Sequence, residues 1–308
     1  MTQIKTVESL MPKSAEVIVI GSGIGGLCCA ALTARAGKEV LVLEAHSQPG
    51  GAAHGFERQG YRFESGPSLW SGLSRWPSSN PLAQILRALD QPLDVLTYKD
   101  WDVLFPEGHL RVGVGGDGFE RVVERLRGPE AVAEWQRFTE VLQPIAAAAD
   151  ALPLLALPAS VDGIGPLLRR SGRLVQHLPA IRHLSGAFGP LVDRHLQDPF
   201  LRHWVDLLCF LISGMPMADT NAAAMATLFG EWFDPESCLD FPKGGSAAVV
   251  DALVCGLEAH GGSLRLGARV SQVLLDGDRA IGVQLSNGET LYADVVVSNT
   301  DAWGTAAL

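Results

Sequence analysis

The hydrophobic pattern is sharpest near the start of the chain, in residues 16–44 (EVIVIGSGIGGLCCAALTARAGKEVLVLE). An apolar run over residues 17–20 precedes a glycine-rich turn, and an alanine-rich stretch follows the turn. A second strand-like segment over residues 39–43 contains an apolar run and is followed by Glu44. Short apolar runs bounded by glycine are typical of buried strands. The segment therefore predicts a strand, a tight turn, a helix and a second strand.

The pattern changes over residues 76–240. Apolar residues recur at helical spacing in residues 80–89, 119–127 and 134–142. Prolines interrupt the later part of this region and predict helices that are short or kinked. They are Pro144, Pro153, Pro158, Pro166, Pro179, Pro190 and Pro199.

Residues 194–233 are the most apolar part of this region. One interpretation is an ordinary helical core. The other is the wall of a long hydrophobic pocket, because methionine and aromatic side chains suit an apolar ligand of variable shape. Both interpretations stay open for these residues: Leu201, Trp204, Leu207, Leu208, Phe210, Leu211, Met215, Met217, Met225, Leu228, Phe229, Trp232 and Phe233.

Strand patterning returns over residues 241–308. The dipeptides Asp276-Gly277 and Asn287-Gly288 are strong hairpin signals between three strand-like segments. The apolar run at residues 294–298 predicts one more strand, which returns to the sheet. A helix is expected over residues 246–258, and strands are expected over residues 263–266, 269–275, 280–285 and 290–292.

These patterns predict an α/β fold with a Rossmann-like domain, built from the βαβ unit and a three-stranded β-meander, and a mostly helical insert. Residues 15–75 and 241–308 are expected to form a discontinuous cofactor-binding domain, and residues 76–240 a substrate-binding insert. A plain nicotinamide domain would run βαβαβ without interruption. The split layout therefore favours a flavin.

Composition excludes several classes of function. A formal net charge of −10 and the lack of a basic stripe argue against binding to nucleic acid. The five cysteines lack CxxC spacing and are expected to be reduced core residues. Neither the polar N-terminal segment nor the longest uncharged run in the middle of the chain, residues 207–218, predicts a signal peptide or a membrane-spanning helix. We expect a cytoplasmic protein for which peripheral membrane contact stays open.

The glycines of the turn follow the spacing GxGxxG, as Gly21, Gly23 and Gly26. Gly21 permits the tight turn, Gly23 lets a diphosphate approach the backbone, and Gly26 lets the helix pack closely on the strand. The amides and the positive dipole end of the helix then hold the anion. Glu44 is placed to accept hydrogen bonds from ribose hydroxyls, and its charge disfavours a 2′-phosphate.

Several segments together carry a family resemblance: GSGIGGLCCA, LVLE followed by PGGAA, YRFESGPS, FPKGGSAAVVDALVCGLEAHGG, the LSNGE hairpin and ADVVVSNTDAW. On these residues the chain resembles the phytoene-desaturase-like flavoproteins, and within them the carotenoid isomerase and retinol saturase branch. The resemblance covers residues 16–303 and implies FAD as cofactor.

The resemblance also implies which residues bind the cofactor. Gly21, Ser22, Gly23, Gly25 and Gly26 match the pyrophosphate loop, and Glu44 matches the ribose ligand. Gly50 and Gly51 match the glycine pair beside the flavin, and Val270 matches the strand residue whose backbone faces the adenine. Many desaturase-type members carry Arg or a hydroxyl residue after the pair, where this chain has Ala52, Ala53 and His54.

Members of this family close the flavin site with a later glycine-rich segment, and no such segment follows Asp294. We therefore expect a partial sequence that lacks the C-terminal part of the fold. The resemblance implies a flavin enzyme that desaturates, saturates or isomerises a hydrophobic polyene, either a carotenoid or a retinoid-like molecule. Two alternatives stay open, a flavin amine oxidase and a truncated, non-catalytic flavoprotein fragment.

The sequence identifies no catalytic residue and no metal site. His54 lies next to the glycine pair, where a loop histidine is more often structural. The histidines of the insert lack metal-ligand spacing: His177, His183, His195 and His203. Asp206, Asp219 and Glu231 could rim a pocket, although charged residues at helix ends are usually solvated. The oligomeric state is not predicted.

Overall fold

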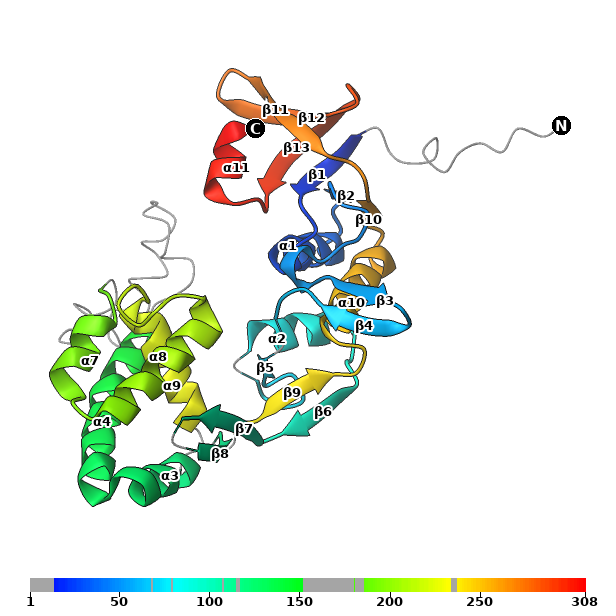
Figure 1. Ribbon diagram of the computed structural model, residues 1–308. Helices are drawn as coiled ribbons and strands as arrows, with labels where there is room; N and C mark the ends of the chain where they lie inside the picture. The colour runs from blue at the N-terminus through cyan, green and yellow to red at the C-terminus, as the bar shows by residue number, and fades with distance from the viewer. Residues whose placement is uncertain are drawn as a thin grey trace. The chain divides into compact units, whose positions relative to one another are not determined.

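The computed structural model describes residues 14–67, 69–78, 80–106, 108–114, 117–151, 180, 186–233 and 237–308. The chain divides into two compact units, Met1–Tyr98 with Leu239–Leu308, and Lys99–Cys238 (Figure 1). The second unit begins at Lys99 and not at the change of pattern near Trp76, so residues 76–98 pack with the first unit. That residues 15–75 and 241–308 bind the cofactor stays a prediction. That residues 76–240 bind the substrate also stays a prediction.

A six-stranded sheet forms the centre of the first unit. Its order is β10 (Ser263–Arg265), β2 (Val40–Leu43), β1 (Ser14–Ile20), β13 (Thr290–Ser298), β12 (Arg279–Leu285) and β11 (Val270–Asp276). The first four of these strands are parallel, and β13, β12 and β11 pair in antiparallel fashion. The predicted α/β fold with its βαβ unit and β-meander is confirmed.

The end of the chain differs from the prediction in one respect. The strands expected over residues 290–292 and 294–298 are a single strand, β13. Only Ala293 separates the two expected segments, and no turn residue is present to break the strand. The first residues of β13 pair with β12, while Tyr292 to Ser298 pair with β1. The meander is thus continuous with the parallel sheet.

The alternation of side chains along β1 and β2 divides the core of this unit into two layers. On one face, Val17, Val19, Val40 and Val42 pack against α1 (Ile24–Arg35), α2 (Pro81–Ala88) and α10 (Ser246–Ala259). On the other face, Ile18, Ile20, Leu41 and Leu43 pack against residues of the meander. Burial on both faces explains why residues 17–20 of β1 and all four residues of β2 are apolar.

Two smaller sheets complete the first unit. A hairpin joins β3 (Gly55–Arg58) and β4 (Tyr61–Glu64). A three-stranded sheet has the order β5 (Trp70–Ser71), β9 (Leu239–Pro242) and β6 (Val95–Tyr98). The strand β9 leads directly into the turn before α10. A short helix, α11 (Ala302–Ala307), follows β13 and begins at Asp301, whose carboxylate accepts from the Gly304 N–H at 2.8 Å.

Among the residues that the structure describes, the second unit is mostly helical, as predicted. Its helices are α3 (Asp117–Arg127), α4 (Pro129–Ala151), α7 (Gly189–His195), α8 (Pro199–Ser213) and α9 (Ala222–Phe233). The hairpin of β7 (Asp100–Phe105) and β8 (Gly108–Gly113) precedes them and was not predicted. Leu110 and Val112 of this hairpin are buried in the same core as the helices, so the hairpin belongs to that core.

The prolines affect the helices less than expected. Pro144 lies inside α4, which runs for 23 residues, so of the two predicted outcomes, a short helix or a kinked one, the short helix does not apply there. Leu142, Ile145 and Ala146 on either side of it are buried in the core, and this packing outweighs the lost backbone hydrogen bond. Pro190 and Pro199 lie in the first turns of α7 and α8, where proline is favoured. Pro153, Pro158, Pro166 and Pro179 lie outside the described residues.

Most of the apolar residues between 194 and 233 form an ordinary core. Leu201, Trp204, Leu208, Met225 and Phe229 are buried, and Leu207, Met217, Leu228 and Trp232 pack against them. Phe210, Leu211 and Met215 are exposed, at 60%, 43% and 43% of their surface. The side chain of Phe233 lies outside the described set. The buried residues and those packed against them therefore belong to an ordinary helical core. The interpretation as a pocket wall stays open only for the exposed residues Phe210, Leu211 and Met215.

Candidate functional site

The glycine turn lies at the carboxyl end of β1, where α1 begins. Gly21 adopts a φ of +94°, and its N–H donates to the Leu43 carbonyl of the neighbouring strand at 2.8 Å. Gly23 is the N-cap residue of α1 and brings no side chain to cap it. The first N–H groups of a helix have no intrahelical acceptor. The end of α1 therefore presents free donors to an anionic group such as a diphosphate.

Close packing explains two of the glycines. A Cβ atom on Gly26 would overlap the carbonyl oxygen of Gly21, so α1 could not lie this close to β1. A Cβ atom on Gly50, where φ is +113°, would lie 2.8 Å from Cγ2 of Val250 in α10. A larger residue at either position would displace a helix. The geometry supports the packing role predicted for Gly26.

The pair Gly50 and Gly51 lies directly against the turn. The Gly50 N–H donates to the Ser22 carbonyl at 2.9 Å, and Gly50 pairs with Gly23 as an isolated parallel bridge. A Cβ atom on Gly51 would lie 3.1 Å from the Cα atom of Gly23. Two backbone segments thus meet with no side chain between them. The result is a cradle of backbone atoms that a nucleotide cofactor fits and that a Cβ atom would fill.

Glu44 is held by the turn itself. One carboxylate oxygen accepts from the N–H and the hydroxyl of Ser22, at 2.8 and 2.6 Å, and the other accepts from the His46 N–H at 2.8 Å. Burial acts to raise the pKa of Glu44, but these hydrogen bonds outweigh it and lower the pKa below its usual value. Glu44 is therefore ionised at neutral pH and can accept further hydrogen bonds from ribose hydroxyls.

Val270 lies close to Glu44 through the backbone. The N–H of Ala268, two residues before Val270, donates to the Glu44 carbonyl at 2.7 Å. Val270 begins β11, and its side chain is buried in the layer that also contains Leu43. The structure thus brings together the residues predicted to meet the ribose and the adenine.

A histidine and a serine meet beside the glycine pair. His54 Nδ1 lies 2.8 Å from the Gly51 carbonyl, and Nε2 lies 3.0 Å from the hydroxyl oxygen of Ser65. Because a carbonyl only accepts, Nδ1 carries the proton and the Ser65 hydroxyl donates to Nε2. The sequence singled out His54 but not Ser65, which the pairing of β3 with β4 brings next to it.

A second long-range pair joins two segments that the sequence singled out separately. The Glu64 carboxylate accepts from the Ser246 N–H at 2.5 Å and so caps the N-terminus of α10. The Ser246 hydroxyl donates to the Pro67 carbonyl at 2.5 Å. Glu64 and Ser246 are 182 positions apart, so neither sequence spacing nor a local capping pattern reveals their contact. The pair fixes α10, whose Val250 contacts Gly50.

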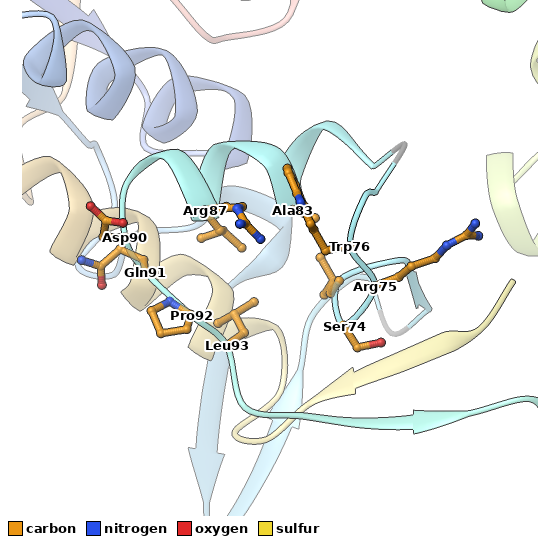
Figure 2. Close-up of a pocket in the computed structure, with 11 residues that line it drawn as sticks. Ser74, Arg75, Trp76, Ala83, Arg87, Asp90, Gln91, Pro92 and Leu93 are labelled. Atoms are coloured by element: carbon orange, nitrogen blue, oxygen red, sulfur yellow. The ribbon is translucent and has the colours of Figure 1, made fainter. Parts of the chain in front are cut away.

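The first unit also contains an open pocket of about 440 Å³, whose lining includes no residue of the glycine turn (Figure 2). Its lining combines apolar side chains with the charged residues Arg75, Arg87 and Asp90, and Figure 2 shows the end of the Arg75 side chain directed away from the other lining residues. The Arg87 guanidinium lies 4.0 Å from the centre of the Trp76 ring. Such a lining suits an amphiphile with an anionic group. No residue predicted to bind the cofactor lines this pocket, and the sequence did not predict it.

The buried carboxylate of Asp240 supports the rim of the pocket. Asp240 is fully buried in β9, and its carboxylate accepts from the N–H groups of Leu73 and Ser74, at 2.7 and 3.0 Å, and from the Thr97 hydroxyl at 2.8 Å. These bonds compensate for its burial and fix the segment that precedes Trp76.

Among the described residues, no group of three or more histidine, cysteine, aspartate or glutamate side chains could hold a metal ion. His177 and His183 lie outside the described residues. Asp206, considered for a pocket rim, accepts from the Met217 N–H at 2.8 Å and supports the loop after α8. Within the described part of the chain, no helix combines the length and apolar character needed to cross a bilayer.

Comparison with curated proteins gives relatives that act on polyenes. The chain is 30% identical over 297 residues to a prolycopene isomerase of an Oncidium hybrid cultivar, covering 94% of this chain and 49% of that protein. It is 28% identical over 304 residues to a lycopene-forming phytoene desaturase of a Paracoccus strain, covering 94% of this chain and 55% of that protein. It is 27% identical over 315 residues to an all-trans-retinol 13,14-reductase of Rattus norvegicus, with coverage of 96% and 49%. The chain thus spans about half the length of these relatives.

The fold is also that of a solved oxidoreductase. A crystal structure of an oxidoreductase from Methanosarcina mazei superposes with a TM-score of 0.65 at 18% identity, covering 95% of this chain and 60% of that one. The family model for flavin-containing amine oxidoreductases matches residues 24–307. With the glycine turn, the ionised Glu44 and the mixed sheet in place, this match shows that the chain belongs to the flavin-containing amine oxidoreductase family.

Proposed function

We propose that the first unit binds FAD through the ADP half of the cofactor. The observation that carries this proposal is the glycine turn, where the free N–H groups of α1 lie next to an ionised Glu44. The α1 amides and the backbone of Gly21, Gly23, Gly25 and Gly26 would hold the diphosphate. Glu44 would accept from the ribose, and the backbone at Val270 would face the adenine.

Ser22 has an indirect part in this proposal. It is fully buried, and both its N–H and its hydroxyl donate to Glu44. Ser22 would therefore position Glu44 and not touch the cofactor. Gly50 and Gly51 would form the side of the cradle nearer the flavin, and His54 with Ser65 lies directly beyond them.

We infer that the whole protein is an oxidoreductase or isomerase of a hydrophobic polyene. A flavin supplies the exchange of hydride or electrons in such a reaction, and the protein binds and orients both partners. Three curated relatives of different reaction type are named for carotenoids or a retinoid. The exposed apolar residues at the end of α8, Phe210, Leu211, Ile212 and Met215, offer a contact surface for such a substrate. Desaturation, saturation and cis–trans isomerisation are all compatible with these features.

A flavin amine oxidase is the second candidate, because the matching family model is described by that chemistry. An amine site needs polar groups or an aromatic cage around a cation. The chain has only three tyrosines, and Tyr61, Tyr98 and Tyr292 all lie in the first unit and not among the helices of the second. The polyene is therefore the favoured substrate class.

Two experiments test the proposal in sequence. Purified protein that carries flavin absorbance, or takes up added FAD, supports the cofactor assignment, whereas colourless protein that takes up none contradicts it. The full-length gene is then expressed in cells that accumulate phytoene or poly-cis lycopene, and the pigments are separated by chromatography. A changed pigment supports the polyene assignment. Unchanged pigments, together with hydrogen peroxide released from an amine, would overturn it.

We also propose a cytoplasmic location with peripheral membrane contact through the pocket of Figure 2. Trp76 is 53% exposed there, and Arg87, whose guanidinium lies over the Trp76 ring, would meet anionic lipid headgroups. Cosedimentation with vesicles that contain anionic lipid should fall on Trp76→Ala, while Trp303→Ala, at an 84% exposed position, serves as control. Equal sedimentation of both variants and wild type would contradict this contact.

A further inference from the structure

Asn299 lies at the centre of the glycine turn, although it comes from the far end of the chain. It directly follows β13, and its N–H donates to the Ile20 carbonyl at the end of β1 at 2.9 Å. The connection that leaves β1 runs to β2 on one side, whereas β13 is reached from β12 on the other side. In open α/β sheets, ligands bind at the carboxyl ends of strands where the connections diverge in this way. Asn299 occupies that point.

The side-chain amide of Asn299 faces three glycines of the turn. A Cβ atom on Gly23 would lie 2.9 Å from Asn299 Nδ2, and one on Gly26 would lie 3.0 Å from the same nitrogen. A Cβ atom on Gly25 would lie 2.9 Å from Oδ1. The lack of side chains on these glycines therefore leaves room for this amide. The space beside Gly23 is where a diphosphate approaches the backbone in this type of turn.

The chemistry of the turn favours an additional donor. Residues 21–44 carry only two cations, Arg35 and Lys38, at the opposite end of α1. After the glycine pair the chain has Ala52 and Ala53, which offer no side-chain donor. The amide of Asn299 has two N–H donors, is half-buried, and makes no hydrogen bond within the described residues. The side-chain amide can therefore donate to an anion without first breaking another hydrogen bond.

We propose that the Asn299 side chain donates a hydrogen bond to the diphosphate of the bound cofactor. The diphosphate is then held from two sides, by the N-terminal amides of α1 and by the amide at the end of β13. This inference rests on the proposed binding of FAD at the turn and adds a ligand from the strand on the other side of β1.

The test measures the affinity of the chain for FAD and ADP by calorimetry. Asn299→Ala should weaken both ligands about tenfold, because one hydrogen bond to a charged group is lost. Asn299→Asp, which keeps the shape but adds a negative charge, should weaken them about a hundredfold and do so most at low salt. Asn287→Asp is the matched control, since its side chain only accepts from the Glu289 N–H in a hairpin turn and an aspartate retains that bond. It should leave both affinities unchanged.

The outcomes separate the two levels of the proposal. If wild-type protein binds neither FAD nor ADP, the proposed function fails. If wild type binds and Asn299→Ala binds equally well or more tightly, Asn299 merely fills the turn and the inference fails. A second measurement on wild type does not depend on a stable variant. The side-chain amide resonance of Asn299 in ¹⁵N-labelled protein should shift on addition of ADP and not of adenosine, and an equal shift with adenosine would contradict contact with the diphosphate.

Discussion

The glycine turn of the first unit and the helical core of the second show two different ways in which sequence determines structure. At the turn, backbone conformation and close approach decide which residues fit, as at Gly26 and Gly50. In the second unit, buried apolar side chains such as Trp204 and Phe119 fill a core, with ring centres 4.7 Å apart. A turn of this kind accepts few alternatives, whereas an apolar core accepts many. Function is therefore easier to recognise in the first unit.

The largest effect should come from a core deletion that leaves the turn untouched. Trp204 is 1% exposed and packs on Phe119, so Trp204→Ala should lower the free energy of unfolding of the second unit by about 3–5 kcal/mol. FAD affinity should not change. Chemical denaturation combined with FAD titration checks both, and Trp303→Ala, at an exposed position, is the control. A parallel loss of FAD affinity would show that the two units do not behave separately.

The converse change is Gly26→Ala at the turn. The added methyl group overlaps the Gly21 carbonyl and forces α1 away from β1, so FAD affinity should fall about a hundredfold, or about 2.7 kcal/mol. Gly118→Ala in α3 is the control, because its Cβ atom meets ordinary contacts of 3.6 Å or more and alanine favours the helix. Unaltered binding by Gly26→Ala would mean that the turn is not the cofactor site.

The negative charge of Glu44 at the glycine turn should make the stability of the first unit depend on pH. Its pKa is lowered in the folded protein, so its contribution to stability is present above the unfolded pKa of about 4.3 and is lost as the pH falls through the folded value. Glu44→Gln should weaken FAD binding about tenfold at pH 7. Urea unfolding of wild type and variant should differ at pH 6 and converge toward pH 3. A difference that persists unchanged at pH 3 would exclude the charge as its cause.

A last comparison uses one thiol in each unit as a reporter, the half-buried Cys28 and the buried Cys209. Burial raises the pKa of Cys28 in α1 to about 11 and that of Cys209 in α8 to about 12, so both should react slowly with a thiol reagent at pH 8. FAD at about ten times its Kd should slow labelling of Cys28 about tenfold and leave Cys209 unchanged. Mass spectrometry after timed labelling resolves each site, with the exposed Cys255 as a fast-reacting control. Equal protection of Cys28 and Cys209 would argue against a site confined to the first unit.

The local pattern of apolar and glycine residues predicted those helices and strands that form from short continuous segments. The strands β1 and β2, the helix α1 between them and the hairpin turn at Asn287 follow from apolar runs and glycine placement. The continuity of β13 was missed because it depends on pairing with β1, which lies about 280 positions away in the sequence. The passage of α4 through Pro144 was missed because packing outweighed the local cost of proline.

The same distinction applies to the site. Gly21, Gly23, Gly26 and Glu44 could be found because one short segment contains them. Ser65 beside His54, Glu64 at the N-terminus of α10 and Asn299 over the turn come together only through tertiary contacts. The pocket at Trp76 was missed for the same reason. Its lining includes polar residues on the loops at both ends of α2, which have no apolar periodicity.

The most direct test of the central claim is a titration of the purified chain with FAD, with ADP as competitor. We predict that FAD binds at one site per chain and that ADP displaces it, because the glycine turn and Glu44 hold the ADP half of the cofactor. A chain that is folded by circular dichroism and binds neither FAD nor ADP would contradict the assignment of this turn as a cofactor site.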